Sequence, residues 1–475
     1  MHDEQSGSNA KSWQLSDVLV SCPCMEVLES LPFAFIQAAR PLLFIFASVM
    51  MSITSPAQPS SAASPASASI NFSAIESSPT ITRLKKRLES GNDRALADFW
   101  GQVARAGTPL IEPAQGNPRQ VIVTFIWRGD QRTEGVGLLA PLQNSPGMPN
   151  FPLSRLLNTD VWYKCWQMRD DLRFTYSFLP KAQPGEKGDQ QHPVTDPLNP
   201  HRMNVAYDEG IPATEFSIAS MPNALDESWI LKKTGVPAGK VERFELKSPI
   251  LGKERGISVY TPPGYSDNPK NEYWLLVLFD GFFYRSSIPT PTILDNLIHA
   301  GKVPPMVAVL IDNPPESRGS ELGYDRAFVE FLSKDVLPWI HEHWSVTHDP
   351  RKRIVGGLSM GGSEAAFVAM RHPQEFGNVL SQSGSFADGD GKDIKSEWLS
   401  SQYKAIPRLP LRFFIEEGLL ENVSRGGPTG VDANRDFVQI LKSKGYPTTY
   451  VEVGGSHEPV HWRAALAEGL VSLTK

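Results

Sequence analysis

The spacing of hydrophobic and polar positions changes along the chain, and each change marks a different kind of structure. Between residues 81 and 105, apolar residues recur at three- or four-residue intervals, which predicts helix. Asn92 and Asp93 interrupt this pattern and Gly107 follows it, so two helices are expected in this stretch.

From residue 110 to about 180 the chain carries short runs of β-branched and aromatic residues. The runs cover 121–127, 136–139, 161–168 and 172–178, with Gly, Pro, Asn and Asp between them. Short strands at this spacing predict a small β-sandwich. Aromatic residues of such a domain usually lie in its core, where we expect Trp127, Trp162, Tyr163 and Trp166.

After residue 242, strands and helices alternate. Continuous apolar runs at 274–279 and 306–311 predict strands covered on both faces, and the runs 244–247 and 256–260 predict antiparallel edge strands. Further strands are expected at 353–355, 379–383, 411–415 and 449–453, and helices at 292–300, 326–343, 365–370, 433–444 and 462–473. This alternation predicts a doubly wound α/β sheet of the α/β-hydrolase type.

These patterns predict four regions. Residues 1–78 form a leader and a linker, 79–221 a small N-terminal β-sandwich domain, 222–241 a connection, and 242–475 a catalytic α/β domain. The linker is expected over 52–78, because this segment is rich in Ser, Ala and Pro and cannot bury enough apolar surface to fold.

The leader has the pattern of an export signal. Arg40 precedes an apolar run at 41–51, and Ser55 and Ala57 then fit a small-x-small cleavage site, so a signal peptide is expected at about 35–57. Because such signals begin close to the initiator, we expect translation to start further along, for example at Met25. The mature protein is then expected in the periplasm or outside the cell, with a cytoplasmic location as the alternative.

Composition narrows the possible partners. The 475 residues are 40% hydrophobic and 21% charged, with a net charge of −6 at pH 7. This balance lacks the basic footprint of a nucleic-acid-binding protein. The apolar run at 41–51 is too short to span a bilayer, and three cysteines are too few for a disulfide framework. We therefore expect a small-molecule substrate, no nucleic acid partner and no stable membrane insertion of the mature chain.

A candidate nucleophile lies between a predicted strand and a predicted helix. Residues 357–361 read Gly-Leu-Ser-Met-Gly and fit G-x-S-x-G, which in this context indicates a nucleophile elbow centred on Ser359. A serine needs a positioned base, and in α/β-hydrolases the chain order is Ser, acid, His. His457 follows the last predicted strand and is the expected base. His461 lies one helical turn further, but without a third ligand it predicts no zinc site, and no metal or cofactor is expected.

The acid of the triad should follow the strand predicted at 411–415. Glu421 is the first candidate, because it lies on the loop after that strand, and Asp432 is the alternative. Glu416 and Glu417 lie nearer the expected strand end and are expected to be solvated.

Two backbone N–H groups are needed to stabilise the oxyanion of the tetrahedral intermediate. We expect one from Met360, directly after the nucleophile, and the other from Gly281 or Phe282, directly after the strand at 274–279. Arg318 and Glu321 follow another strand end at the same rim of the sheet. Both side chains are expected to contact the substrate, and the guanidinium would bind an anionic group on it.

With these residues in place, the chain resembles the enterochelin (enterobactin) esterase family over nearly everything after residue 80. The motifs that carry the resemblance are GTPLIEP at 107–113, VTFIWRG at 123–129, TDVWY at 159–163, DPLNP at 196–200, LFDG at 278–281, RGSEL at 318–322, GLSMGG at 357–362, SQSGSF at 381–386 and GLLE at 418–421. The resemblance implies hydrolysis of the ester bonds of a catecholate siderophore, Glu421 as the acid of the triad, and Arg318 facing an anionic ferric catecholate.

The chain departs from the family pattern beside the site. The usual GGH is Gly455-Ser456-His457 here, and Ala387-Asp388 stands where two tryptophans are common. Because these departures lie beside the site, they bear on which ester is bound more than on the type of reaction. A general or feruloyl-type carboxylesterase with the same triad is therefore the alternative function, and a non-catalytic binding protein is the third.

Overall fold

The computed structural model describes residues 72–142, 149–182, 192–206, 209–268, 272–387, 397–423 and 428–475. The predicted signal peptide and most of the predicted linker lie outside these residues. Ile70–Lys475 form one compact unit. Within the described ranges, every helix is too short or too polar to cross a membrane.

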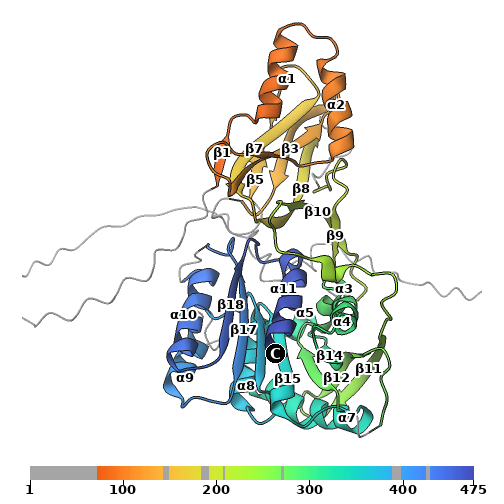
Figure 1. The fold of residues 1–475 in the computed structure, drawn as a ribbon, viewed down its shortest axis with the longest axis vertical. Helices are drawn as coiled ribbons and strands as arrows, with labels where there is room; N and C mark the ends of the chain where they lie inside the picture. The colour runs from red at the N-terminus through yellow and green to blue at the C-terminus, as the bar shows by residue number, and fades with distance from the viewer. Residues whose placement is uncertain are drawn as a thin grey trace, which may run out of the picture. The chain divides into compact units, whose positions relative to one another are not determined.

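The described residues of the N-terminal region form two β-sheets and two helices. Figure 1 shows how these elements are arranged. One sheet has the order β1-β7-β3-β2 with β6 beside β7, and the other has the order β5-β4-β8-β10-β9. The strands are β1 (Ser73–Ile75), β2 (Leu110–Pro113), β3 (Gln120–Arg128), β4 (Thr133–Leu139), β5 (Asn150–Pro152), β6 (Ser154–Arg155), β7 (Val161–Arg169), β8 (Arg173–Ala182), β9 (Arg202–Val205) and β10 (Thr214–Ser220). The helices are α1 (Pro79–Glu89) and α2 (Ala95–Ala106), with the break at the predicted position.

The sequence predicted that four aromatic residues of this region lie in its core, and two of them are buried there. Trp166 and Trp162 are buried, and Trp166 packs edge-on against Phe125. Trp127 and Tyr163 are only partly buried. The alternating pattern of β3 and β7 places these large rings between the sheets, which is the main apolar contact of a small sandwich.

Strand β1 corrects the predicted linker. Ser73–Ile75 pair antiparallel with β7, and Ile75 lies opposite Cys165. The polar composition of 52–78 concealed this short edge strand, because three residues that pair along one edge need little apolar surface of their own. The ordered chain continues directly into α1, where the Ser78 side chain accepts a hydrogen bond from the Ile81 N–H and caps the helix.

The second half of the chain forms an eight-stranded sheet with the order β11-β12-β14-β13-β15-β16-β17-β18. The edge pairs β11–β12 and β12–β14 are antiparallel and the remaining pairs are parallel, so the doubly wound α/β prediction is confirmed. The strands are β11 (Lys240–Ser248), β12 (Lys253–Thr261), β13 (Trp274–Leu278), β14 (Met306–Ile311), β15 (Arg353–Leu358), β16 (Asn378–Gln382), β17 (Arg412–Gly418) and β18 (Thr448–Val453). A 3-10 turn, η2 (Ser228–Ile230), lies in the connection between the two halves.

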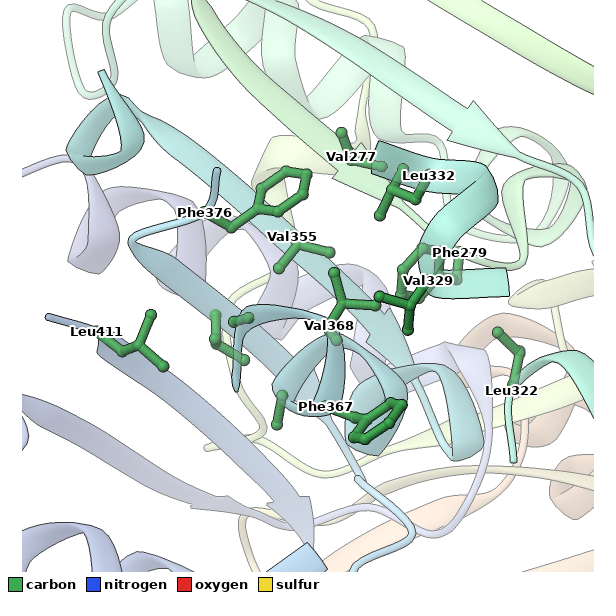
Figure 2. Close-up of a cluster of buried hydrophobic side chains, with 14 of the residues drawn as sticks. Val277, Phe279, Leu322, Val329, Leu332, Val355, Phe367, Val368, Phe376 and Leu411 are labelled. Atoms are coloured by element: carbon green, nitrogen blue, oxygen red, sulfur yellow. The ribbon is translucent and has the colours of Figure 1, made fainter. Parts of the chain in front are cut away.

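Helices cover both faces of this sheet (Figure 1). They are α3 (Gly281–Ser286), α4 (Thr290–His299), α5 (Pro315–Glu321), α6 (Arg326–Phe331), η3 (Leu332–Val336), α7 (Leu337–His343), η4 (Pro350–Lys352), α8 (Met360–Arg371), α9 (Trp398–Ala405), α10 (Gly430–Ser443) and α11 (Pro459–Leu473). On one face, Val277 and Val355 of neighbouring strands pack with Val368 of α8 and Leu332 (Figure 2). The central strands are buried along their length, and this fixes the loops at their carboxyl ends.

Candidate active site

Ser359 occupies a strained turn between β15 and α8. Its backbone has φ 55° and ψ −126°, a conformation that non-glycine residues rarely adopt. The turn is tight: a Cβ atom on Gly357 would lie 2.5 Å from the carbonyl carbon of Gly361. A glycine at position 357 therefore lets the strand and the helix approach closely enough to hold the Ser359 hydroxyl above the sheet.

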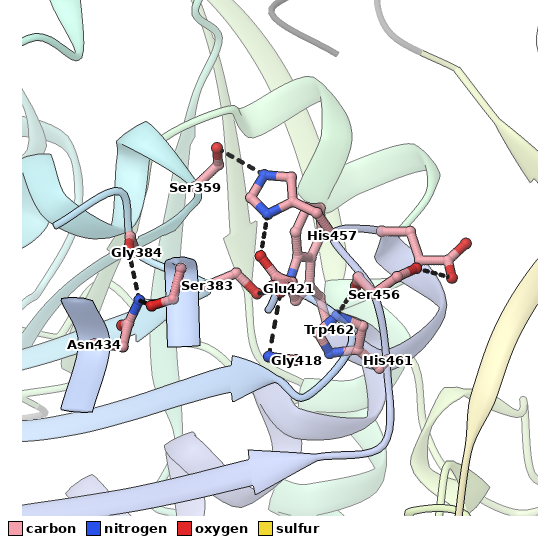
Figure 3. A network of polar contacts seen from close by, with 12 residues as sticks. Ser359, Ser383, Gly384, Gly418, Glu421, Asn434, Ser456, His457, His461 and Trp462 are labelled. Carbon is pink, nitrogen blue, oxygen red and sulfur yellow. Dashed lines mark hydrogen bonds and ion pairs between the residues drawn. The ribbon is translucent and has the colours of Figure 1, made fainter. Parts of the chain in front are cut away.

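Three side chains from separate loops form a hydrogen-bonded series (Figure 3). Nε2 of His457 lies 2.9 Å from Oγ of Ser359, and Nδ1 of His457 lies 2.5 Å from Oε2 of Glu421. Burial alone would raise the pKa of Glu421, but the charge of His457 and its hydrogen bond outweigh burial and lower that pKa. Glu421 is thus a carboxylate that can only accept, so the shared proton belongs on Nδ1 and Nε2 presents a lone pair to Ser359.

The other carboxylate oxygen of Glu421 is held by donors that the sequence analysis missed. Oε1 accepts from the Ser383 hydroxyl at 2.6 Å and from the Gly418 N–H at 3.2 Å. The Ser383 oxygen in turn accepts from Nε1 of Trp462 at 2.8 Å. Ser383 lies in the SQSGSF motif at 381–386, so the motif was available as a signal, but its contact with Glu421 is a property of the fold. Both oxygens of the carboxylate are therefore oriented.

Asp432, the alternative acid, lies elsewhere. It occupies the first turn of α10, where its carboxylate accepts from the Thr429 hydroxyl at 2.8 Å and its side chain is 47% exposed. Thr429 caps the same helix by accepting from the Asp432 N–H. The prediction of Asp432 as the partner of His457 is wrong, because the sequence around Thr429 forms a helix start that holds this carboxylate locally.

Glu416 and Glu417 are fully buried, which corrects the expectation that they are solvated. β17 extends through both residues to Gly418 in register with β18, so the strand is longer than its apolar run. Nδ1 of His461 forms a 2.7 Å ion pair with Glu416, and Nε2 of His461 contacts the carbonyl oxygen of Ser456. Burial would lower the pKa of His461, but the charge and hydrogen bond of Glu416 outweigh it and raise that pKa.

Glu417 differs from its neighbour in its ionisation. Burial first, and then the charges of Glu421 and Glu416, raise the pKa of Glu417 well above its usual range. A raised pKa favours the uncharged form of this side chain beside the Glu421 carboxylate.

The three expected oxyanion donors lie at helix N-termini. Met360 is the first residue of α8, and Gly281 and Phe282 are the first two residues of α3. The N–H groups of a first helical turn have no intrahelical acceptor, and the helix dipole there favours negative charge. A Cβ atom on Gly281 would lie 2.4 Å from the backbone of Leu310, so a glycine lets α3 begin directly against β14.

Arg318 and Glu321 both lie on α5, and each has a charged partner. Nε and Nη2 of Arg318 bind Asp280 at 2.6 and 2.9 Å, so a bidentate pair stands next to the start of α3. Glu321 is only 4% exposed. It contacts Arg255, forms a 3.0 Å ion pair with Lys253 and fastens α5 to β12. The prediction of Glu321 as a substrate contact is wrong, because its carboxylate is bound by the buried Arg255 and by Lys253.

Among the residues that the structure describes, no group of three or more His, Cys, Asp and Glu side chains is arranged to hold a metal ion.

Comparisons with known proteins match both halves of the chain. Residues 122–230 match the family described as "Enterochelin esterase, N-terminal", and residues 248–473 match the family described as "Putative esterase". The chain is 29% identical over 420 residues to the iron(III) enterobactin esterase of Dickeya dadantii, an alignment that covers 78% of this chain and 91% of that protein.

Solved structures give the same result. The ferric enterobactin esterase of Salmonella typhimurium superposes with a TM-score of 0.67 at 25% identity, covering 79% of this chain and 98% of that one. The enterobactin esterase of Shigella flexneri, solved in the presence of enterobactin, gives a TM-score of 0.62 at 25% identity over 79% of this chain and 97% of that one. The sandwich and the α/β sheet are thus shared in sequence and in arrangement, and the chain belongs to the enterochelin esterase family of carboxylic ester hydrolases.

Proposed function

We propose that this protein is a serine esterase that hydrolyses the ester bonds of a catecholate siderophore such as ferric enterobactin, with Ser359, His457 and Glu421 as its triad. The observation that carries the proposal is the hydrogen-bonded series from Ser359 Oγ through His457 to the Glu421 carboxylate. In this series the base has an oriented partner on one side and the nucleophile on the other, which is the arrangement that acyl transfer requires.

The reaction follows from this arrangement. Nε2 of His457 takes the proton of Ser359 as Oγ attacks the ester carbonyl, and Glu421 stabilises the resulting imidazolium. The N–H of Met360 and an N–H of Gly281 or Phe282 stabilise the oxyanion. His457 then gives its proton to the leaving alcohol, which departs and leaves an acyl group on Ser359. Water, deprotonated by His457, attacks this acyl-enzyme and releases the carboxylic acid and free Ser359.

The choice of substrate is supported by the relatives. The Dickeya dadantii relative carries the name iron(III) enterobactin esterase, and the Shigella flexneri structure was solved in the presence of enterobactin. Both alignments span the sandwich as well as the catalytic domain, so the whole arrangement is shared.

Mass spectrometry of the products would test this function. The purified protein is incubated with ferric enterobactin, with iron-free enterobactin and with a small nitrophenyl ester, and Ser359→Ala is the control. We expect linear fragments of the siderophore from the unsubstituted protein and none above background from Ser359→Ala. Hydrolysis of the nitrophenyl ester alone would favour the general esterase, hydrolysis that survives Ser359→Ala would refute the triad, and siderophore binding without any hydrolysis would favour the binding protein.

We also propose that the mature protein is exported. The proposal rests on the apolar run at 41–51 and the small residues that follow it. The full chain would be expressed in a Gram-negative host, the cells fractionated, and the mature N-terminus determined by mass spectrometry. Recovery in the periplasm or the medium with a terminus near residue 57 is expected, and an uncut chain in the cytoplasm would refute export.

A further inference from the structure

The loop that carries His457 is held from the N-terminal domain as well as from the catalytic domain. The Thr175 hydroxyl on β8 donates to Oε2 of Glu458, the residue after His457. The Thr175 N–H donates to both oxygens of the same carboxylate, each at 3.1 Å. Glu458 therefore accepts three hydrogen bonds from a domain that contributes no residue to the triad.

Glu458 stands at the start of α11, but its side chain does not cap this helix. It is the N-cap residue of α11, where a side chain would ordinarily accept from its own helix, yet its carboxylate makes no such bond. Its Oε1 instead accepts from the Ser456 hydroxyl at 2.5 Å. Glu458 thus forms a hydrogen bond with Ser456, on the other side of His457, and three with Thr175 of the sandwich.

Backbone contacts bring the same two segments together. The Arg173 N–H donates to the Gly454 carbonyl oxygen at 2.6 Å. A Cβ atom on Gly454 would lie 2.3 Å from the carbonyl oxygen of Asp171, so only glycine permits this approach. The start of β8 is therefore seated directly on the turn that leads to His457.

The loop that carries Glu421 is held in a similar way. Leu419 and Leu420, just before the acid, are buried in the same apolar cluster as Leu172 and Phe174 of the sandwich. The Leu420 N–H donates to the Gly455 carbonyl oxygen at 2.8 Å, which joins the acid loop to the histidine loop. Both loops that orient the triad are thus packed against one domain.

From these contacts we propose that Thr175 is a positioning residue for the esterase reaction, acting through Glu458 on His457, so that the N-terminal domain is part of the catalytic arrangement. The proposal rests on the proposed function, because it assumes that His457 is the base. Thr175 is 4% exposed, and its action on the reaction passes through Glu458. Its loss should therefore change the turnover of an ester that does not touch the sandwich.

Thr175→Val tests this with the full-length protein. The substitution keeps the shape of the side chain and the backbone N–H but removes the hydroxyl that donates to Glu458. For a small nitrophenyl ester we expect kcat to fall about tenfold while KM stays within about twofold. Thr175→Ser should restore kcat, because it returns the donor. The matched control is Thr124→Val, which removes another buried hydroxyl of the sandwich, one that contacts Cys165 within the domain, and should leave kcat unchanged.

A double-mutant cycle separates positioning from general destabilisation. If Thr175 acts through Glu458, Thr175→Val should have little further effect in a Glu458→Gln background. Equal losses in both backgrounds, or a Thr175→Val protein with unchanged kcat and only a lower melting temperature, would overturn the proposal. If Thr175→Val does not fold, Thr175→Ser and Glu458→Gln are compared in its place, and an unchanged kcat for Glu458→Gln refutes the proposal.

The rate at which a fluorophosphonate labels Ser359 keeps this test distinct from that of the proposed function. An unsubstituted protein that hydrolyses none of the esters would refute the proposed function, yet slower labelling of Thr175→Val would still support positioning. Labelling of Thr175→Val at the unsubstituted rate would refute positioning, whatever ester the enzyme takes.

Discussion

Replacing Glu421 by glutamine tests the geometry of the triad most sharply, because the structure predicts which way the amide must point. Ser383 and the Gly418 N–H both donate to the position of Oε1. The amide oxygen of glutamine can satisfy these donors and the NH₂ group cannot, so the NH₂ group must face Nδ1 of His457.

That orientation places the wrong tautomer beside the nucleophile. An NH₂ group at the former Oε2 donates to Nδ1, so the histidine proton moves to Nε2, which then faces Ser359 Oγ without a lone pair. An acid-to-amide change of this kind in a serine protease lowers kcat about 10⁴-fold. By the same logic, we expect a loss of about 10³- to 10⁴-fold here, or about 4 to 5.5 kcal/mol of barrier.

The assay is the steady-state hydrolysis of a small nitrophenyl ester, with circular dichroism to establish that the variant is folded. Glu417→Gln is the matched control, since Glu417 is a neighbouring buried side chain whose pKa is raised by burial and by the nearby carboxylates. Because a raised pKa favours the uncharged acid, an uncharged amide at this position should change kcat by no more than about threefold. A folded Glu421→Gln protein that keeps more than about a tenth of its kcat would refute the assignment of Glu421 and of the tautomer.

Two further predictions concern the support of the site. His461→Gln should lower the free energy of unfolding by about 3 to 5 kcal/mol at pH 6, because it leaves Glu416 buried without its partner. The pKa of His461 is raised in the folded state. The stabilisation from the ion pair is therefore complete below the unfolded pKa of about 6.5 and is lost as pH rises through the folded pKa. In urea unfolding, the difference in stability between the two proteins should shrink toward alkaline pH. A pH-independent difference would contradict the ion pair. Leu420→Ala should cost about 2 to 5 kcal/mol of stability in the same assay and also lower kcat, because the cavity lies under the acid loop, and a loss of stability with unchanged kcat would contradict that coupling.

The parts of the site that could be predicted from sequence are those with a local pattern. The elbow at Ser359 needs a strand, small neighbours and a helix in succession, and all three are visible in sequence. His457 follows from the order of the elements, because the last strand must be succeeded by the base in this fold. Glu421 was one of several carboxylates on one stretch, and only the structure distinguishes it from Asp432 by contact with the histidine.

The parts that were missed depend on contacts between distant segments. Ser383 follows β16 and Trp462 lies in α11. The hydrogen bond from Trp462 to Ser383, and the one from Ser383 to Glu421, have no signature in spacing. Glu416 and Glu417 were expected to be solvated because the apolar run ends at Ile415, but parallel pairing with β18 carries the strand onward and buries both carboxyls. Pairing of this kind is a tertiary property that overrides local polarity.

Arg318 explains why the ester is harder to predict than the reaction. The RGSEL motif implies an arginine that faces an anionic substrate, but here the guanidinium is already bound by both oxygens of Asp280. A bidentate pair is close to neutral, so an anionic ferric catecholate must compete with Asp280 for the same donors if it is to use them. The outcome depends on the geometry of that pair and on which groups the substrate brings to it, and neither is encoded in the identity of one residue. Recognition of the ester is therefore decided by arrangements around the triad, while its cleavage follows from the triad itself.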